Sequence, residues 1–335
     1  MKLAIIGATG LVGGKMTEVL EEFNFPVEEF IPVGSPASIG KRVKYAGKEH
    51  IVQDIRHALE KRPDIVLFSA GAEVSGKWAR TFANAGAFVI DNSSAWRMDP
   101  DVKLIVPEVN IRTLTKKDRL IANPNCSTIQ MVVALNPILR NFGISRIVVS
   151  TYQSVSGSGM KGIHQLESER SGRQNGNTYP HRIDLNCLPH CDVFMDNGYT
   201  GEEMKLINET RKIFNNDSIH ISATAVRVPV TGGHSESIYI ETEREAGLPD
   251  IHRVLNQAPG VVLQDNLEKA EYPMPYYSKD RNEVFVGRIR KDLFNPKALK
   301  MWVVADNLRK GAALNAVQIA VYVMKEFLIE KEVMA

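Results

Sequence analysis

The sequence predicts an α/β protein in which a parallel sheet is followed by a mixed sheet. From Met1 to about Asn125, short apolar strands alternate with helical segments, which is the pattern of a parallel sheet with helices on both faces. Beyond this point the strands become longer and richer in β-branched residues, as in mixed or antiparallel sheets. A chain of 335 residues is long enough for about two domains, each with its own core.

The first element is a buried strand at Met1–Ile6, and a glycine-rich turn and a helical pattern through Leu20 follow it. The turn reads Gly-Ala-Thr-Gly-Leu-Val-Gly-Gly from Gly7. Glycines at such a junction let the backbone approach a pyrophosphate, which the helix N–H groups receive. The spacing differs from the commoner G-x-G-x-x-G, and such a turn also opens other α/β proteins. We interpret it as a dinucleotide site.

The loop after the second strand, Glu29–Gly34, indicates which dinucleotide binds. A carboxylate is expected there when the site holds the ribose 2′-hydroxyl of NAD. The chain instead has the hydroxyls of Ser35 and Ser38 and then the cations Lys41 and Arg42, which suit the 2′-phosphate of NADP. An ordinary polar loop has a similar composition.

The next elements complete the parallel sheet. The pattern predicts two apolar strands with a helix between them, at Asp64–Phe68, Ala87–Ile90 and Ser75–Ala85. Arg97 follows the second of these strands, at the carboxyl edge where ligands bind in α/β folds. The alternative for Arg97 is an exposed salt bridge.

Cys126 stands where a loop meets a helix predicted at Ser127–Arg140. The preceding Asn123-Pro124-Asn125 cannot continue a strand, and the apolar spacing that follows fits one buried helical face. A thiol at a helix N-terminus lies in the positive end of the helix dipole, which favours the thiolate. A lone cysteine is more often a core residue. Its setting here favours a nucleophile.

The second half of the chain supplies further polar candidates. Its strands are predicted at Arg146–Tyr152, Ile219–Arg227 and Ser237–Glu241. Gln153, at the end of the first, is expected either to bond a substrate or to be a satisfied surface amide. The loop between the other two carries Arg227 and His234. A histidine after Gly-Gly at a strand start is expected to be exposed and to act as general acid/base, although an isolated histidine is more often structural.

Residues 155–201 are rich in Gly, Ser, Asn and Pro and are expected to form a long excursion. Within it, the stretch Ser156–Asn197 is too long for an ordinary loop and carries scattered apolar residues, so we expect it to bury against a second copy of the chain. Those residues are Leu166, Tyr179, Ile183, Leu185, Leu188 and Phe194. The final helix, at about Gly311–Glu330, is expected to close back on the first domain.

Composition excludes several classes of protein. A net charge of +2, from 41 basic and 39 acidic residues, gives no electrostatic footprint for nucleic acid or an anionic membrane. No apolar run reaches the ~18 residues of a membrane span, and Met1–Leu3 leads into a strand rather than a signal peptide. Three cysteines argue against a disulfide framework and for a reducing cytoplasm. A metal site at Cys187–Asp192 is disfavoured, because no second Cys/His pair has matching spacing.

Three segments, read with the glycine turn, carry a family resemblance: Asn123–Thr128, Gln153–Gly157 and Arg227–His234. With them, essentially the whole chain resembles the aspartate-β-semialdehyde dehydrogenase family. The resemblance implies a glyceraldehyde-3-phosphate-dehydrogenase-like architecture. In it, residues 1–126 and 312–335 form a Rossmann-type NADP-binding domain, and residues 127–311 form an α+β catalytic and dimerisation domain. Relatives assemble as dimers or tetramers, and we expect a homodimer.

The resemblance also implies a role for each matching residue. Cys126 would form the acyl-enzyme, His234 would be its acid/base partner and Gln153 would orient the acyl group. Arg227 would bind the substrate α-carboxylate and Glu202 its amino group. The phosphate-binding positions would be Arg97, Asn125 and Lys205. The cofactor positions would be Gly7, Thr9, Gly10, Leu11, Val12, Gly13, Ser35, Ser38, Ser156, Gly157 and Asn307. Relatives often carry Arg where this chain has Ala37, so Lys41 or Arg42 would have to take its place.

The implied reaction is the NADP-dependent reductive dephosphorylation of L-aspartyl 4-phosphate to L-aspartate 4-semialdehyde, a step of lysine, threonine and methionine biosynthesis. No metal is expected. One alternative is N-acetyl-γ-glutamyl-phosphate reductase, but that enzyme needs no anion for a free amine, so Glu202 argues against it. The other is a non-catalytic NADP-sensing regulator, which would have no reason to keep Cys126 and His234 in these settings.

Overall fold

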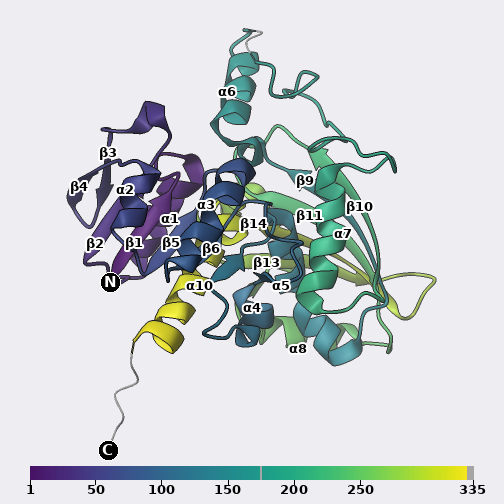
Figure 1. Cartoon of the computed structure of the whole chain (residues 1–335). Coiled ribbons are helices and arrows are strands. Elements are labelled where there is room, and N and C mark those ends of the chain that lie inside the picture. Colours follow the sequence, from purple (N-terminus) through teal and green to yellow (C-terminus); the bar gives the residue numbers. More distant parts are fainter. Residues whose placement is uncertain (174–175, 330–335) are drawn as a thin grey trace, which may run out of the picture. The chain divides into compact units, whose positions relative to one another are not determined.

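The computed structural model describes residues 1–173 and 176–329, which form two compact units (Figure 1). Met1–Pro124 and the segment from Ala312 make the first unit, and Asn125–Gly311 makes the second. The expected succession of a parallel sheet and a mixed sheet is confirmed. No helix among the described residues is both long and apolar enough to cross a membrane.

The first unit is built on a six-stranded sheet in which every pair of strands is parallel. In spatial order its strands are β2 (Glu29–Val33), β1 (Lys2–Ile6), β5 (Ile65–Phe68), β6 (Phe88–Asp91), β8 (Leu120–Ala122) and β7 (Lys103–Leu104). A separate hairpin is formed by β3 (Arg42–Tyr45) and β4 (Lys48–Ile51). The helices are α1 (Leu11–Glu22), α2 (Ile55–Glu60), α3 (Ala72–Asn84), α4 (Pro107–Asn110) and α10 (Leu314–Val323).

The core of this unit joins the two ends of the chain. Leu3 and Ile5 of β1 are buried in one apolar cluster with Met16 of α1 and with Val317 and Ala320 of α10. The last helix is shorter than expected, because π-helical turns flank α10 at Arg309–Ala313 and Met324–Leu328. The expected end of this helix at Glu330 lies outside the described residues.

The turn between β1 and α1 leaves no room for side chains at two of its glycines. Gly7 has φ +94°, and a Cβ on it would lie 2.5 Å from the carbonyl oxygen of Ser69. A Cβ on Gly13 would lie 2.2 Å from the carbonyl oxygen of Gly7. The backbone therefore folds tightly on itself where α1 begins, which leaves the start of that helix uncovered by side chains.

The second unit is a six-stranded mixed sheet. In spatial order its strands are β10 (His220–Arg227), β9 (Arg146–Gln153), β11 (His234–Glu241), β14 (Ala298–Ala305), β13 (Val284–Lys291) and β12 (Val261–Leu263). The central strand β11 runs antiparallel to both β9 and β14. The helices α5 (Cys126–Phe142), α7 (Gly201–Phe214) and α8 (Leu248–Asn256) pack on this sheet.

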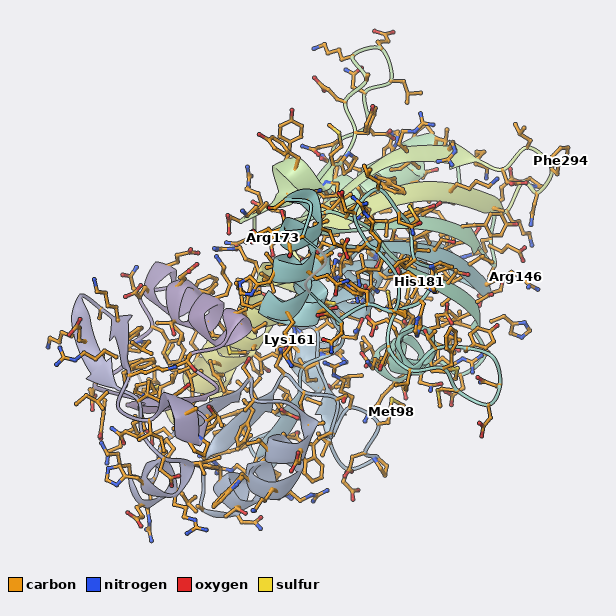
Figure 2. The ribbon with its side chains drawn as sticks, turned by 90° about the horizontal axis from the view of Figure 1, so that it is seen from above. Met98, Arg146, Lys161, Arg173, His181 and Phe294 are labelled. Atoms are coloured by element: carbon orange, nitrogen blue, oxygen red, sulfur yellow. The ribbon has the colours of Figure 1, made fainter. Side chains whose placement is uncertain are left out.

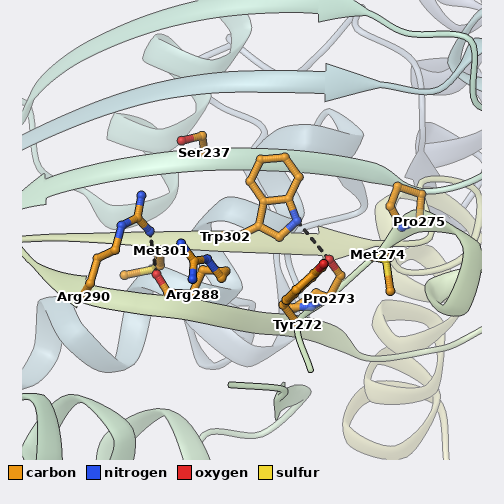
Figure 3. A pocket seen from close by; sticks show the side chains of 9 residues that line it. All are labelled: Ser237, Tyr272, Pro273, Met274, Pro275, Arg288, Arg290, Met301 and Trp302. Carbon is orange, nitrogen blue, oxygen red and sulfur yellow. Dashed lines mark hydrogen bonds between the residues drawn. The ribbon is translucent and has the colours of Figure 1, made fainter. Parts of the chain in front are cut away.

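The other face of the mixed sheet carries half-buried aromatic side chains. Ser237 faces Trp302 in the strand register, and the rings of Trp302 and Tyr152 lie 5.3 Å apart. A pocket of about 450 Å³ opens on this face (Figure 3). Its lining residues are Ser237, Tyr272, Pro273, Met274, Pro275, Arg288, Arg290, Met301 and Trp302. Figure 2 shows Arg146 and the exposed Phe294 toward one end of the same sheet.

The segment expected as an irregular excursion contains a helix that the sequence pattern did not predict, α6 (Gly159–Arg170). The pattern did not indicate a helix here, because the segment contains two glycines and its apolar residues show only a weak helical periodicity. Of the six apolar residues expected to bury against a second copy of the chain, four are buried within their own unit and two are exposed. The buried four are Leu166, Tyr179, Ile183 and Leu188, and the exposed two are Leu185 and Phe194.

Gly13 and Gly14 make a matched pair for testing the turn. We expect Gly13→Ala to destabilise the protein by about 1–3 kcal/mol, because the new methyl group would overlap the Gly7 carbonyl. Nothing lies within 4 Å of a Cβ on Gly14, so Gly14→Ala in the same helix should stabilise it by about 0.5–1 kcal/mol. Urea denaturation measures both changes. Equal effects of the two substitutions would contradict the tight turn.

Candidate active site

Helix α5 begins at Cys126 and is capped by the residue before it. The side-chain oxygen of Asn125 accepts hydrogen bonds from the backbone N–H groups of Ser127, at 3.0 Å, and Thr128, at 3.3 Å. Cys126 is half-buried, and a Cβ placed on Gly311 would lie 2.8 Å from the Cβ of Cys126. The thiol thus lies at the positive end of a helix of 17 residues, which favours its ionised form.

A buried carboxylate on α7, that of Glu202, joins three of the polar residues that the sequence singled out. One oxygen of Glu202 accepts from the amides of Asn125, at 2.9 Å, and Gln153, at 3.2 Å. The other accepts from Lys205 Nζ at 3.1 Å, and this lysine also pairs with Asp192. Burial by itself would raise the pKa of Glu202, but Lys205 and the Asn125 amide outweigh it and bring the pKa to about 2. Glu202 is therefore an anion at neutral pH.

Gln153 is tied to the start of α5 as well as to Glu202. It is buried at the end of β9, and its amide nitrogen donates to Ser127 Oγ at 3.0 Å. The residue next to Cys126 thus contacts Gln153 directly. The alternative of a satisfied surface amide is wrong, because the side chain is buried.

His234 is fully buried, so the expectation that it is exposed was wrong. It begins β11, which lies between β9 and β14, and a Cβ on Gly157 would lie 3.3 Å from its ring. The Ser154 N–H donates to Nδ1 at 3.0 Å, so the neutral ring carries its proton on Nε2. Burial, and then the charge of Arg227, lower the pKa of His234 to about 3. The imidazole is therefore neutral at physiological pH.

Arg227 ends β10 and is also buried. Its Nη1 donates to the Ser154 carbonyl at 2.8 Å, and its guanidinium lies 5.9 Å from the Tyr179 ring centre. Within the described residues Nε has no hydrogen-bond partner. A Cβ on Gly157 would lie 2.8 Å from Nη1, so only glycine there leaves the fork open. A buried guanidinium with unused donors suits a planar anion such as a carboxylate.

Asn307 fixes the backbone around His234. Its side-chain oxygen accepts from the hydroxyls of Ser154 and Ser156, each at 3.1 Å, and from the Gly233 N–H at 3.2 Å. Ser156 and Asn307, expected as cofactor positions, thus make contacts that hold the end of β9 to the loop before β11. Sequence reasoning gave no role to Ser154. Its position beside Gln153 in a run of small residues was the only available signal.

In the first unit, Arg97 is buried rather than in an exposed salt bridge. Its Nε donates to the carbonyl of Asn123 at 2.9 Å and its Nη2 to that of Asn92 at 3.0 Å. Both acceptors follow parallel strands, so Arg97 lies at the carboxyl edge of the sheet, as predicted.

The predicted cofactor residues of the first unit gather beside the glycine turn. The hydroxyls of Thr9 and Ser35 lie 3.4 Å and 3.5 Å from that of Ser38. Gly10 precedes α1 as its N-cap, and Leu11, Val12 and Gly13 form its first turn. The two cations that follow, Lys41 and Arg42, are both exposed, and Arg42 pairs with Glu49.

Comparison with known proteins gives the family. A model described as "Semialdehyde dehydrogenase, NAD binding domain" matches residues 2–117, and one described as "Semialdehyde dehydrogenase, dimerisation domain" matches residues 135–310. The aspartate-semialdehyde dehydrogenase of Aquifex aeolicus is 54% identical over 337 residues, which cover 98% of this chain and 99% of that protein. That of Bacillus subtilis is 46% identical and covers 96% of each.

Solved structures agree with this assignment. The structure of aspartate semialdehyde dehydrogenase II from Vibrio cholerae superposes with a TM-score of 0.93 at 46% identity, over 97% of this chain and 99% of that one. The expected architecture, a Rossmann-like domain with a mixed-sheet domain of the glyceraldehyde-3-phosphate-dehydrogenase type, is confirmed. The chain therefore belongs to the aspartate-semialdehyde dehydrogenase family, a family of oxidoreductases of amino-acid biosynthesis.

Proposed function

We propose that this protein reduces L-aspartyl 4-phosphate to L-aspartate 4-semialdehyde with NADPH, through a covalent intermediate on Cys126, in lysine, threonine and methionine biosynthesis. The observation that carries the proposal is the thiol at the capped start of α5, next to the hydrogen-bonded set of Asn125, Gln153 and Glu202. A related Vibrio cholerae enzyme, 45% identical, has been solved in complex with ASA.

The chemistry follows from covalent catalysis. The Cys126 thiolate attacks the acyl carbon, the C–O bond to phosphate breaks and inorganic phosphate leaves. A thioester remains, whose carbonyl accepts hydride better than a carboxylate does. The nicotinamide supplies that hydride when bound. The resulting tetrahedral alkoxide then collapses, the C–S bond breaks, and the aldehyde and the thiolate are released.

We propose that His234 acts on the oxygen of the tetrahedral species as its acid/base partner. Its Nε2–H, which has no hydrogen-bond partner within the described residues, can donate to the developing oxyanion. The Ser154 N–H, which donates to Nδ1 at 3.0 Å, keeps this proton on Nε2. Such general acid–base help is typically worth ~10²–10⁴ in rate.

Charge complementarity supports an aspartate-like substrate. The guanidinium fork of Arg227 matches an α-carboxylate, and the anionic Glu202 matches a free ammonium group. An N-acetylated substrate has no such cation, which argues against N-acetyl-γ-glutamyl-phosphate reductase. We assign phosphate binding to Asn125 and Lys205, and Arg97 remains a predicted phosphate ligand from the resemblance.

We further propose NADP as the cofactor. The hydroxyls near Ser38 and the exposed Lys41 suit a 2′-phosphate, and the glycine turn before α1 suits the pyrophosphate. A related Candida albicans enzyme, 25% identical with a TM-score of 0.76, has been solved with NADP. The NADP-binding domain would comprise residues 1–126 and 312–335, and the catalytic and dimerisation domain residues 127–311. Because Cys126, Cys187 and Cys191 are all thiols, we place the enzyme in the reducing cytoplasm.

The first test is the loss of the nucleophile. Cys126→Ser should lose nearly all turnover in phosphate-dependent NADP reduction with aspartate semialdehyde, yet still bind NADP, because a hydroxyl lacks the thiolate population. Cys187→Ser, which changes an exposed cysteine, is the control and should keep its activity. More than about a tenth of the parental kcat in Cys126→Ser would rule out the covalent route. The same assay with NAD and with the N-acetylglutamate analogue tests cofactor and substrate.

A second test addresses the carboxylate site. Arg227→Lys keeps the charge but loses the planar fork, so the KM for the semialdehyde should rise much more than the KM for phosphate. Arg146→Lys, at the half-exposed start of β9, should change neither value. If both KM values rise equally in Arg227→Lys, this arginine does not hold the α-carboxylate.

We propose that the protein is a homodimer that packs through the uncovered face of the mixed sheet. The matched family model is named a dimerisation domain and spans that sheet. Four of the six apolar residues singled out in the 155–201 segment are buried within their own unit. On the sheet face, Trp302 lines an open pocket, and both it and the neighbouring Tyr152 are half-buried. A second copy would cover both residues.

Light scattering should therefore give twice the chain mass of 37.3 kDa. Trp302→Glu should shift the protein toward the monomer, because it places an unpaired charge in the buried interface. Leu185→Glu, in the 155–201 segment, should leave the dimer intact. If Leu185→Glu gives a monomer and Trp302→Glu stays dimeric, the interface lies in the 155–201 segment instead. If the parental protein is an active monomer, the proposal of a dimer is wrong.

A further inference from the structure

Two buried polar side chains meet between helix α5 and strand β11, apart from the Glu202 network. Glu236 of β11 is completely buried, and within the described residues neither of its carboxyl oxygens has a hydrogen-bond partner. The amide of Gln130 on α5 interacts with this carboxyl group, and its own oxygen is also without a partner. A carboxylate and an amide oxygen can only accept hydrogen bonds. If Glu236 is ionised, the Gln130 amide group is the donor that it interacts with, and within the described residues Gln130 Oε1 has no donor of its own.

A proton on Glu236 supplies that donor. Burial raises the pKa of Glu236 well above its ordinary value, and the amide of Gln130 offsets only part of this. The facing positions on β9 and β14, Thr151 and Val303, do not titrate. On α5 and β11 the titratable groups at this end are Cys126 and the neutral His234. The other ends carry Arg140, in the last turn of α5, and Glu241.

The position of the pair links the two residues proposed for chemistry. Gln130 lies four residues after Cys126, which is about one turn of α5. Its Nε2 donates to the main-chain carbonyl of His234 at 3.3 Å. Glu236 follows His234 by two residues on the same face of β11. The pair therefore connects the helix that begins at Cys126 with the strand that begins at His234.

We propose that Glu236 is a positioning residue: as a neutral carboxylic acid it donates a hydrogen bond to Gln130 Oε1, and so holds α5 against β11 in the register that Cys126 and His234 need. The inference rests on the proposed roles of these two residues. Glu236 itself need not touch the substrate. Its proton is exchanged with solvent only when the unit opens or folds, so it is a fixed structural proton.

The first experiment needs no substrate and so is independent of the proposed function. A carboxyl group with a raised folded-state pKa costs stability as the pH rises above its unfolded-state pKa, because the unfolded chain ionises first. Glu236→Gln removes that cost and keeps a donor for Gln130. Its Tm should exceed that of the parent by a margin that grows by about 2–4 °C between about pH 5 and about pH 8. Glu241→Gln, half-exposed on the same strand, is the control and should show no such trend.

The second experiment separates positioning from packing. Glu236→Leu removes the donor, and its kcat should fall about tenfold with little change in KM, whereas Glu236→Gln should stay within about twofold of the parent. The alkylation rate of Cys126 by iodoacetamide should change in the leucine variant and recover in the glutamine variant. If the leucine variant does not fold, the Tm measurements on Glu236→Gln decide alone. A Tm margin that shrinks with rising pH, or equal kcat values in both variants, would overturn the proposal.

Discussion

The second unit depends on one buried charge, the carboxylate of Glu202. A carboxylate in the interior is costly unless hydrogen-bond donors and a cation surround it. Here Asn125, Gln153 and Lys205 supply them. Asn125 is the N-cap of α5, Gln153 ends β9, and Lys205 lies one turn after Glu202 on α7. Satisfying this charge therefore fixes the N-cap of α5, the end of β9 and the first turn of α7 relative to one another. The position of Cys126 follows, because its own N-cap is one of the donors.

Ser154 extends this constraint to the other side of the site. Its N–H binds His234, its carbonyl binds Arg227 and its hydroxyl binds Asn307. It is the next residue after Gln153, so one short stretch of β9 contacts both the carboxylate network and the histidine. Few side-chain motions are left to either group, as expected where geometry must be held for catalysis.

The sequence predicted most of the fold because both halves follow simple patterns. The parallel strands are continuous apolar runs, and Asn125 before Cys126 is a strong N-cap, so the boundaries of β1, β5 and α5 lie close to those expected. Helix α6 was missed because Gly159 and Gly162 oppose helix propensity. Gly162 is there because a Cβ would collide with the Val155 carbonyl, which is a tertiary constraint that no local pattern reveals.

The candidate site was predictable in its residues but not in its environment. His234 was expected to be exposed because Gly-Gly precedes it, yet β11 is a central strand, and that placement arises only when β9 and β14 pair with it. Burial raises the pKa of both Glu202 and Glu236, yet the pKa of Glu202 ends low and that of Glu236 stays high. Both are buried glutamates of one unit, but Glu202 lies beside the cation of Lys205, whereas Glu236 lies beside the amide of Gln130. Partners contributed by distant strands and helices thus decide whether each buried carboxyl group is an anion or a neutral donor.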